Sequence, residues 1–247
     1  MKRAFILGLT LLLALDLSAA NPIRIEHLTC EGLVNPLAID STIPHFGWQL
    51  RGTKRDISQR AYRIRVASDS LQLLAGRADL WDSGDVVSDA SVGVPYIGAG
   101  LKAQQRCWWQ VTVTAKGSNK PIDSSIASFG IGLIDPAVIT GEFIGHTASG
   151  ATAVLLRQKF HVRSLADQAL MHVNSLGYHE VWINGDRVGD ACLAPAVSQL
   201  DKRSLWVSYD VGSYLHEGNN EVVIWLGQGW YKPNTFGRWQ PDESYAE

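Results

Sequence analysis

Apolar and polar residues alternate with a period of two along the first half of the chain. In AYRIRVAS, Tyr62, Ile64 and Val66 fall on one face and two arginines on the other, and CWWQVTVTA, residues 107–115, repeats the pattern. Half-buried strands of an antiparallel sheet alternate in this way because successive side chains point to opposite faces. About seven short strands are predicted over residues 24–134, which is typical of an immunoglobulin- or fibronectin-like sandwich.

Two further elements are predicted in this first region. A short helix is expected near SDSLQLLAG, residues 68–76, and SIASFGIGL, residues 125–133, is expected to be a closing strand. Turn-forming groups such as KGSNKP separate the strand-like segments. The first region is therefore predicted to be all-β apart from one helical turn or two.

A second series of strand-like segments follows the break at IDPAVITGEFIG. It comprises AVLLRQKFHV, ALMHVNSLGYHEVWING, SLWVSYDVG and NNEVVIWLGQGW. The step Asn184-Gly185 predicts a tight hairpin, because both central residues of a type I′ turn need a positive φ. Residues 141–247 are predicted to form a jelly-roll sandwich, but they supply about five or six strands where a jelly roll usually has about eight. This indicates either a smaller sandwich or a truncated domain.

The first twenty residues, MKRAFILGLTLLLALDLSAA, are typical of a secretory signal peptide. Lys2 and Arg3 precede an apolar run that ends in small residues, and Asn21 is the expected first mature residue. The run is shorter than the ~20 residues that span a bilayer. A membrane anchor is therefore not predicted, and because no cysteine stands directly after the expected cleavage point, a lipoprotein anchor is not predicted either. The protein is expected to be secreted or periplasmic.

Composition and charge narrow the class of protein further. Hydrophobic residues make up 46% of the chain and the net charge is -2, with the basic residues dispersed, so nucleic acid is not a predicted partner. The cysteines are Cys30, Cys107 and Cys192, an odd number, so at least one thiol lies outside any disulfide within the chain. Cys30 and Cys107 are either neighbours in one domain or small buried hydrophobic residues. No cysteine or histidine spacing predicts a metal site, and no cofactor is predicted.

The segment WLGQGWYKPNTFGRW, residues 225–239, gathers aromatic rings in a glycine-rich loop. Aromatic side chains stack on the C–H faces of sugar rings, so this loop contains the candidate substrate-binding residues. They are Trp230, Tyr231, Phe236 and Trp239 as a stacking platform, with Asn234 and Arg238 as hydrogen-bond donors. The alternative is structural, because aromatic side chains are mostly buried mass. In that interpretation Trp230 and Tyr231 cover the end of the sandwich or pack on another domain, and Trp225 belongs to the core.

Two groups of aspartates raise the question of a calcium site, which would need several oxygen ligands. Neither group follows a calcium-loop spacing, so turn capping is the better interpretation for both. The first group is Asp186, Asp190 and Asp201, and the second is Asp82, Asp85 and Asp89.

No catalytic residue is predicted. Glu31 and Asp40 form no credible catalytic pair with one another or with a histidine. His172 and His179 are expected to belong to strands, where a lone histidine is usually a surface or a satisfied core residue. The serines at positions 175, 198 and 208 lack the G-x-S-x-G context of a nucleophile.

An ordered set of motifs carries a family resemblance. CEGLVNPLAID, QRAYRIRVASD, DLWDSGDVVSDAS and RCWWQVTV are followed by LLRQKF, LGYHEVWINGDRVGD, DKRSLWVSYDV and GNNEVVIWLGQGWY. The first four resemble the N-terminal immunoglobulin-like module of bacterial α-L-rhamnosidases of glycoside hydrolase family seventy-eight, and the others resemble the jelly-roll module that follows it. The chain departs from the family at Ala38 and at residues 196–198, where glycine is frequent. Such a change matters if φ is positive there.

The resemblance implies a non-catalytic role for this chain. In the family, an (α/α)6 barrel that follows these modules performs an inverting hydrolysis of terminal α-L-rhamnosides, with two carboxyl groups ~6.5–9.5 Å apart. The chain is therefore expected to be the non-catalytic N-terminal part of a secreted α-L-rhamnosidase, inactive alone, which positions the barrel or contacts substrate. Its implied partners are a rhamnose-containing glycoside or polysaccharide and the catalytic barrel of a full-length parent. The alternatives are a stand-alone carbohydrate-binding or adhesion module and a structural spacer without a ligand.

Overall fold

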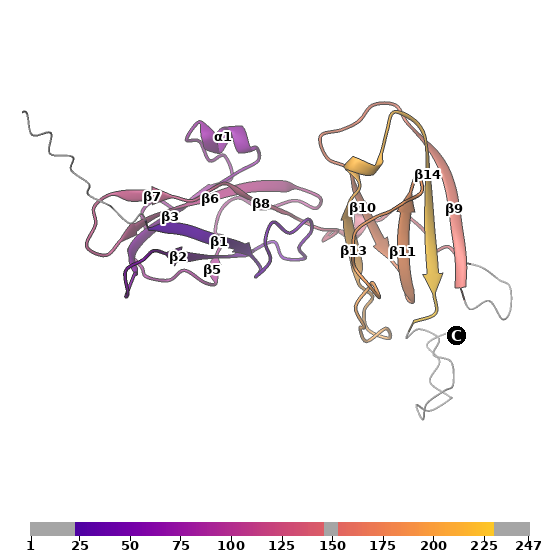
Figure 1. The fold of residues 1–247 in the computed structure, drawn as a ribbon, viewed down its shortest axis with the longest axis horizontal. Coiled ribbons are helices and arrows are strands. Elements are labelled where there is room, and N and C mark those ends of the chain that lie inside the picture. Colours follow the sequence, from indigo (N-terminus) through magenta and orange to yellow (C-terminus); the bar gives the residue numbers. More distant parts are fainter. Residues whose placement is uncertain (1–22, 146–152, 230–247) are drawn as a thin grey trace, which may run out of the picture. The chain divides into compact units, whose positions relative to one another are not determined.

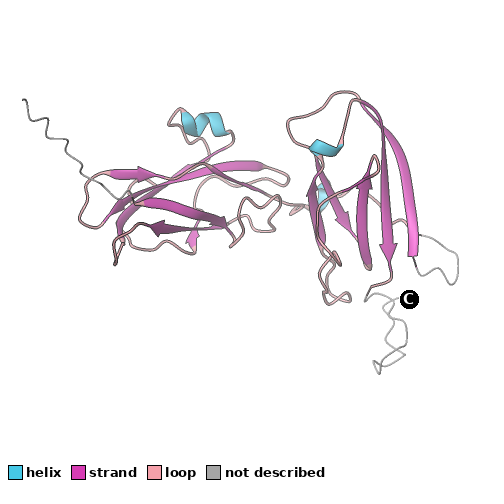
Figure 2. Cartoon of the chain, in the orientation of Figure 1, coloured by secondary structure: helices cyan, strands magenta, loops and turns pink. Residues whose placement is uncertain are grey.

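A computed structural model of the chain describes residues 23–145 and 153–229, so the expected signal peptide lies outside the described residues. Strands dominate the described part (Figures 1 and 2), which confirms the predicted all-β class. The chain divides into two compact units. The first contains residues up to 34, 43–99 and 108–127, and the second contains 35–42, 100–107 and the residues from 128 onward. We call the sandwich of strands β1–β8 the N-terminal sandwich and that of strands β9–β14 the C-terminal sandwich.

The N-terminal sandwich contains two antiparallel sheets. One has the order β1-β2-β5, and the other has the order β4-β3-β6-β7, with β8 also paired to β6. The strands are β1 (Arg24–Cys30), β2 (His45–Arg51), β3 (Gln59–Ala67), β4 (Trp81–Asp82), β5 (Val94–Pro95), β6 (Arg106–Ala115), β7 (Pro121–Asp123) and β8 (Ala127–Gly130).

The core of the N-terminal sandwich lies between these two sheets. Buried and half-buried residues alternate without a break along β6, as the period of two predicts. Phe46 of β2 contacts Trp109 of β6, with ring centroids 4.5 Å apart, so the two sheets meet through aromatic side chains. Trp48 donates a hydrogen bond from Nε1 to Oε1 of Gln59 at 2.9 Å, and both residues are almost fully buried. Gln59 also donates to the backbone oxygen of Ala90 at 2.8 Å.

The other predicted features of this sandwich are present in the structure. The helix α1 (Ser70–Leu74) falls within the expected range, and the carboxylate of Asp69 caps it by accepting from the backbone N–H of Leu71. The strand β8 is shorter than the predicted closing segment. Cys30 and Cys107 are buried on β1 and β6, in agreement with a role as small hydrophobic residues, whereas Cys192 is exposed.

The C-terminal sandwich is built from a four-stranded sheet of order β12-β11-β14-β9 and a two-stranded sheet of β10 and β13. Two 3-10 turns, η1 (Pro136–Val138) and η2 (Gly212–Tyr214), complete the described helices, and none of these is long and apolar enough to cross a membrane. The strands are β9 (Ala153–Val162), β10 (Leu170–Asn174), β11 (Tyr178–Ile183), β12 (Asp186–Arg187), β13 (Trp206–Asp210) and β14 (Gly218–Gly227).

The predicted hairpin joins β11 to β12. Asn184 and Gly185 both have positive φ, at 53° and 91°, and Ile183 pairs with Asp186 across the turn. The side chain of Asn184 also ties the turn to the start of β14, because its Oδ1 accepts from the backbone N–H of Glu221 at 2.9 Å. Asn184 therefore stabilises this turn in two ways: asparagine tolerates a positive φ, and its side-chain amide forms a hydrogen bond to β14.

The hydrophobic core of this sandwich lies where the two sheets overlap. Its buried members come from β10, β11, β13 and the segments next to them, and Val222 of β14 packs against it. The core residues are Val173, Val181, Ile183, Val188, Tyr209 and Val211. No residue of β9 belongs to this cluster, because the two-stranded sheet covers only part of the four-stranded one.

Candidate functional site

The candidate sugar platform lies just beyond the described residues. Trp230, Tyr231, Asn234, Arg238 and Trp239, together with Phe236, all fall in the range 230–247, which the structure does not describe. The described chain ends at Gly229, immediately before this loop. What the structure does show is how the strand that leads to the loop is held.

Close backbone packing holds the end of β14. Gly227 pairs with Tyr178 at the start of β11. A Cβ atom at position 177 would lie 2.1 Å from the carbonyl oxygen of Gly227, so only glycine fits there. Gly229 has a φ of 54°, which glycine adopts without strain, and a Cβ there would lie 3.0 Å from the backbone nitrogen of Tyr178. Gly177, Gly227 and Gly229 therefore fix the backbone path at the end of β14, as far as Gly229.

A shallow pocket lies beside the segment that precedes β11. Its walls come from residues 175–178 and from the loop after the cis peptide bond Ala194-Pro195. The residues at 196–198, where the family often has glycine, line this pocket, and none of them has a positive φ. Ala38 has no positive φ either, so these departures from the family pattern introduce no backbone strain. The lining residues are Ser175, Leu176, Gly177, Tyr178, Pro195, Ala196, Val197, Ser198, Leu200 and Leu205.

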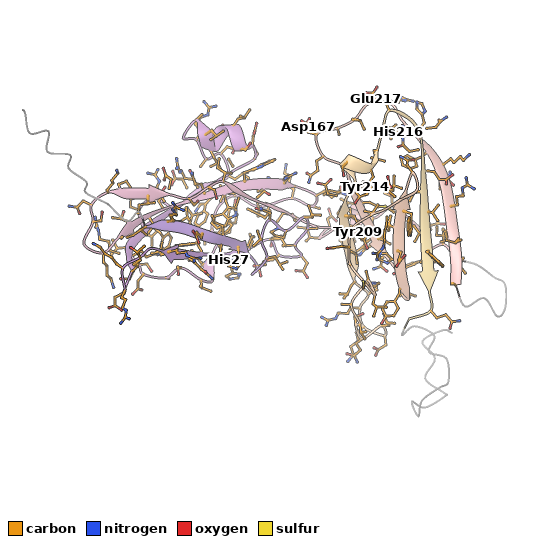
Figure 3. The ribbon with its side chains drawn as sticks, in the orientation of Figure 1. His27, Asp167, Tyr209, Tyr214, His216 and Glu217 are labelled. Atoms are coloured by element: carbon orange, nitrogen blue, oxygen red, sulfur yellow. The ribbon has the colours of Figure 1, made fainter. Side chains whose placement is uncertain are left out.

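A buried hydrogen-bond chain lies behind this pocket. His179 is 3% exposed, its Nδ1 lies 2.7 Å from Oγ of Ser175, and its Nε2 lies 2.9 Å from the hydroxyl of Tyr209. Figure 3 labels Tyr209 in the C-terminal sandwich. The Ser175 hydroxyl donates to the backbone oxygen of Gly177 at 2.8 Å. The hydroxyl of Ser175 has only this one proton to donate, so it must accept a hydrogen bond from His179. We therefore assign the proton of neutral His179 to Nδ1, and Nε2 accepts a hydrogen bond from the hydroxyl of Tyr209.

The pKa shifts of His179 and Tyr209 fit a structural role for these hydrogen bonds. Burial lowers the pKa of His179 and raises the pKa of Tyr209, an effect that nearby Arg187 partly offsets for the tyrosine. Both shifts favour the neutral forms, and both side chains have hydrogen-bond partners. His179 is thus a satisfied core histidine on β11, one of the two alternatives that the sequence left open.

His172 also belongs to a strand, as expected. It lies on β10 and its Nδ1 is 2.7 Å from Oγ of Ser208 on the paired strand β13. Burial lowers the pKa of His172. Ser198 instead donates to the backbone oxygen of Arg203, so Ser175, Ser198 and Ser208 belong to three separate hydrogen-bonding arrangements.

The expectation that Trp225 lies in the core is wrong. Trp225 is on β14, as the strand-like run predicted, but its side chain is 47% exposed. Its register places it opposite Glu180 of β11 and Leu155 of β9, whereas the core residue Val181 lies opposite Ile224. Because side chains alternate along a strand, Trp225 lies on the face turned away from the core. The sequence signal was ambiguous, since apolar residues occupy both faces of this strand.

The aspartates that raised the question of calcium do not gather around a common point. Within residues 23–145 and 153–229, no group of three or more histidines, cysteines or acidic residues is arranged to hold a metal ion. Asp82 forms a bidentate pair with Arg63, at 2.8 and 2.6 Å, and accepts from the backbone N–H of Gly84 at 3.0 Å. The hydrogen bond from Arg63 lowers the pKa of Asp82, despite partial burial.

Two family models match the chain in succession. The Rha78A-like N-terminal immunoglobulin domain matches residues 25–135, and the α-L-rhamnosidase N-terminal domain matches residues 165–246. An α-L-rhamnosidase of Formosa agariphila is 33% identical over 84% of this chain and 24% of its own length. An α-L-rhamnosidase of Alteromonas sp. is 28% identical over 90% of this chain and 26% of its own length.

Solved structures of the same family resemble the chain. An α-L-rhamnosidase from Dictyoglumus thermophilum superposes with a TM-score of 0.78 at 28% identity, and one from Aspergillus terreus with 0.71 at 25% identity. These matches cover 84% and 90% of this chain and 25% of each solved chain. The chain thus spans about a quarter of the length of the relatives it matches. The chain contains the N-terminal immunoglobulin-like domain of these relatives, followed by a segment that matches their N-terminal domain. Together with the two sandwiches, these matches show that the chain belongs to the α-L-rhamnosidase family of glycoside hydrolases.

Proposed function

We propose that this chain is a non-catalytic N-terminal part of an exported α-L-rhamnosidase. In this role the two sandwiches position the catalytic part of the parent enzyme or contact its rhamnose-containing substrate. The observation that carries the proposal is the succession of two N-terminal family matches in a chain that spans about a quarter of its relatives. The parent reaction would be the inverting hydrolysis of terminal α-L-rhamnosides.

The chemistry of the described carboxylates supports a non-catalytic role. A general acid for glycoside hydrolysis needs a raised pKa, so that it still holds its proton near neutral pH. Hydrogen bonds from Ser68 and Arg63 lower the pKa of Asp79 and of Asp82, respectively, which is the opposite of what a general acid needs. Glu180 and Glu221 form ion pairs with Arg187 and Arg157. These groups are suited to holding strands together and not to proton donation.

Turnover of a chromogenic α-L-rhamnoside by the purified chain tests the non-catalytic role. We expect no hydrolysis above the buffer background. A full-length relative such as the Formosa agariphila α-L-rhamnosidase is the positive control. Enzyme-like turnover by this chain, which persists through a second purification step, would overturn the proposal.

Substrate contact is the finer part of the proposal, and it rests on the aromatic loop that follows Gly229. Titration with L-rhamnose, followed by tryptophan emission, measures it, with D-glucose as the matched sugar. We expect a saturable response to rhamnose that the double variant Trp230→Ala and Trp239→Ala abolishes. The variant Trp206→Ala is the control, because Trp206 is 42% exposed on β13, outside the loop. An unchanged response in the double variant contradicts a platform in this loop, and no response at all restricts the role to positioning.

The second candidate function is a stand-alone carbohydrate-binding or adhesion module. The exposed side chain of Trp225, opposite Leu155 on the outward face of the four-stranded sheet, favours it, because aromatic residues on a sheet face can stack on sugars. Binding of a rhamnose-containing polysaccharide with micromolar affinity by this chain alone would support the module. Binding that appears only when a catalytic part of a relative is added would support the positioning role instead.

A further inference from the structure

The strand β9 forms one edge of the four-stranded sheet of the C-terminal sandwich. It is ten residues long and pairs along its whole length with β14, from Ala153 opposite Gly227 to Val162 opposite Gly218. In the described part of the chain, its other edge has no paired strand, and Figure 1 shows β9 at the border of the sheet. A long unpaired edge presents backbone N–H and C=O groups to an incoming strand.

The inward face of β9 is mostly apolar but incompletely covered, and the exposed side chain of Gln158, opposite Val222, interrupts it. Leu156 lies opposite Ile224, which in turn lies opposite the fully buried Val181 of β11, so these residues share the core face of the sheet. The side chains of this face become less buried from β11 towards β9, because the two-stranded sheet covers only the β11 side. The half-buried apolar residues of the inward face of β9 are Val154, Leu156, Phe160 and Val162. An added strand with apolar inward side chains would extend the core over them.

The outward face of β9 is basic and exposed. Arg157, Lys159 and His161 occupy successive outward positions. Glu221 of β14 pairs with Arg157, with Nε to Oε2 at 2.7 Å. No described acidic side chain forms an ion pair with Lys159, although it lies opposite Glu221 in the register. Positive charge therefore remains at the edge where a further strand would lie.

This charge pattern disfavours a second copy of the chain as the occupant. Two antiparallel copies of β9 that keep their core faces on the same side overlap most when Arg157 lies opposite itself or opposite Lys159. Like charges directly opposite one another on paired strands are destabilising. Lysine on an edge strand is a known means by which proteins oppose pairing between identical edges. The same cations favour an acidic partner strand.

We propose that the β9 edge binds an extended segment of another polypeptide, with apolar side chains on its inward face and acidic side chains on its outward face. The segment adds a fifth strand next to β9. Its backbone pairs with the edge, its apolar side chains cover Leu156 and Phe160, and its carboxylates lie beside Arg157 and Lys159. This interaction surface goes beyond the proposed function and does not depend on sugar contact.

Fluorescence anisotropy of labelled nine-residue peptides, titrated with the full 247-residue chain, tests the proposal. The probes are a peptide of alternating valine and glutamate, one of alternating valine and lysine, and the valine–glutamate peptide with every amide N-methylated. We expect the valine–glutamate peptide to bind about tenfold or more tightly than the valine–lysine peptide. The N-methylated peptide keeps its charge but has no N–H groups for strand pairing, so we expect its binding to be lost.

The variant Lys159→Glu identifies the site. This variant should bind the valine–glutamate peptide more weakly and the valine–lysine peptide more tightly than the wild-type chain does. Lys116→Glu, in the N-terminal sandwich, should change neither affinity. Circular dichroism checks that both variants fold, and Lys159→Gln, which removes the charge without reversing it, replaces Lys159→Glu if the latter does not. Equal affinity for both peptides, binding of the N-methylated peptide, or indifference to Lys159→Glu would overturn the proposal. A concentration-dependent dimer that Lys159→Glu strengthens would show that a second copy occupies the edge, which also overturns the proposal.

Discussion

Gly177 lies so close to Gly227 that a Cβ atom at position 177 would be 2.1 Å from the carbonyl oxygen of Gly227. It would also lie 2.8 Å from the carbonyl oxygen of Gln228. Both neighbours are backbone atoms, which cannot rotate away as a side chain does. The segment before β11 and the end of β14 therefore approach one another at a distance that only glycine permits. Gly227 lies three residues before Trp230, the first of the candidate sugar-binding residues.

The first prediction is that Gly177→Ala destabilises the C-terminal sandwich. The new methyl group must displace backbone on β14, and such overpacking costs about 1–3 kcal/mol. Urea unfolding followed by circular dichroism measures the loss in the free energy of unfolding. Gly141→Ala is the matched control, because a Cβ there meets nothing within 4 Å, and we expect a change within about 0.5 kcal/mol. Equal stability of the two variants would contradict the close approach.

A second prediction concerns the buried amide of Gln59. Gln59→Ala leaves Nε1 of buried Trp48 and the backbone oxygen of Ala90 without the hydrogen bonds that the glutamine supplies. An unsatisfied buried donor costs about 1–3 kcal/mol, and the lost packing adds to this cost. The measurement is the thermal midpoint of the N-terminal sandwich. Gln49→Ala, at an exposed position of β2, should leave the midpoint nearly unchanged, and a similar loss in both variants would argue against the buried pair.

The third prediction is a loss of stability on acidification. Burial lowers the pKa values of His172 and His179 below 6.5 in the folded protein. The unfolded chain therefore binds more protons than the folded one as the pH falls through about 6.5. The stability that these neutral histidines contribute is complete above that pH, and it decreases progressively below it.

Urea midpoints measured between pH 8 and pH 5 check this expectation. His179→Gln should reduce the slope of stability against pH between about pH 6.5 and 5, even if it lowers stability at every pH. His161→Gln, at an exposed position of β9, should keep the wild-type slope. An unchanged slope in His179→Gln would show that this histidine does not carry the effect.

A fourth prediction separates the two faces of the four-stranded sheet. Trp225→Ala should cost less than about 1 kcal/mol of unfolding free energy, because the side chain is 47% exposed and faces away from the core. Ile183→Ala should cost about 2–5 kcal/mol, because Ile183 is 2% exposed within the core. Chemical denaturation of the two variants measures the difference. If Trp225→Ala were the more damaging change, the register of β14 described above would be incorrect.

Local patterns in the chain were sufficient for the all-β class, the two series of strands, the short helix and the Asn184-Gly185 hairpin. Each of these depends on contacts between residues near in sequence, such as the alternation of β6 or the positive φ of a two-residue turn. The exposure of Trp225 was not predictable in this way. Its strand carries apolar residues on both faces, and only the pairing with β11 and β9 decides which face is the core.

Some features of the candidate site could likewise be predicted from the sequence, and others could not. The aromatic loop at residues 230–239 was recognisable from residue types alone, because stacking on a sugar needs flat rings and nearby donors. The need for glycine at 177, the chain from Ser175 through His179 to Tyr209, and the basic edge of β9 required the tertiary structure. These features join residues that are far apart in the sequence, such as Gly177 and Gly227 or Arg157 and Glu221, and the sequence of one strand does not encode which strand will lie beside it. The sequence by itself therefore determined the type of each element and the family, whereas strand pairing decided which side chains are buried, satisfied or left open to a partner.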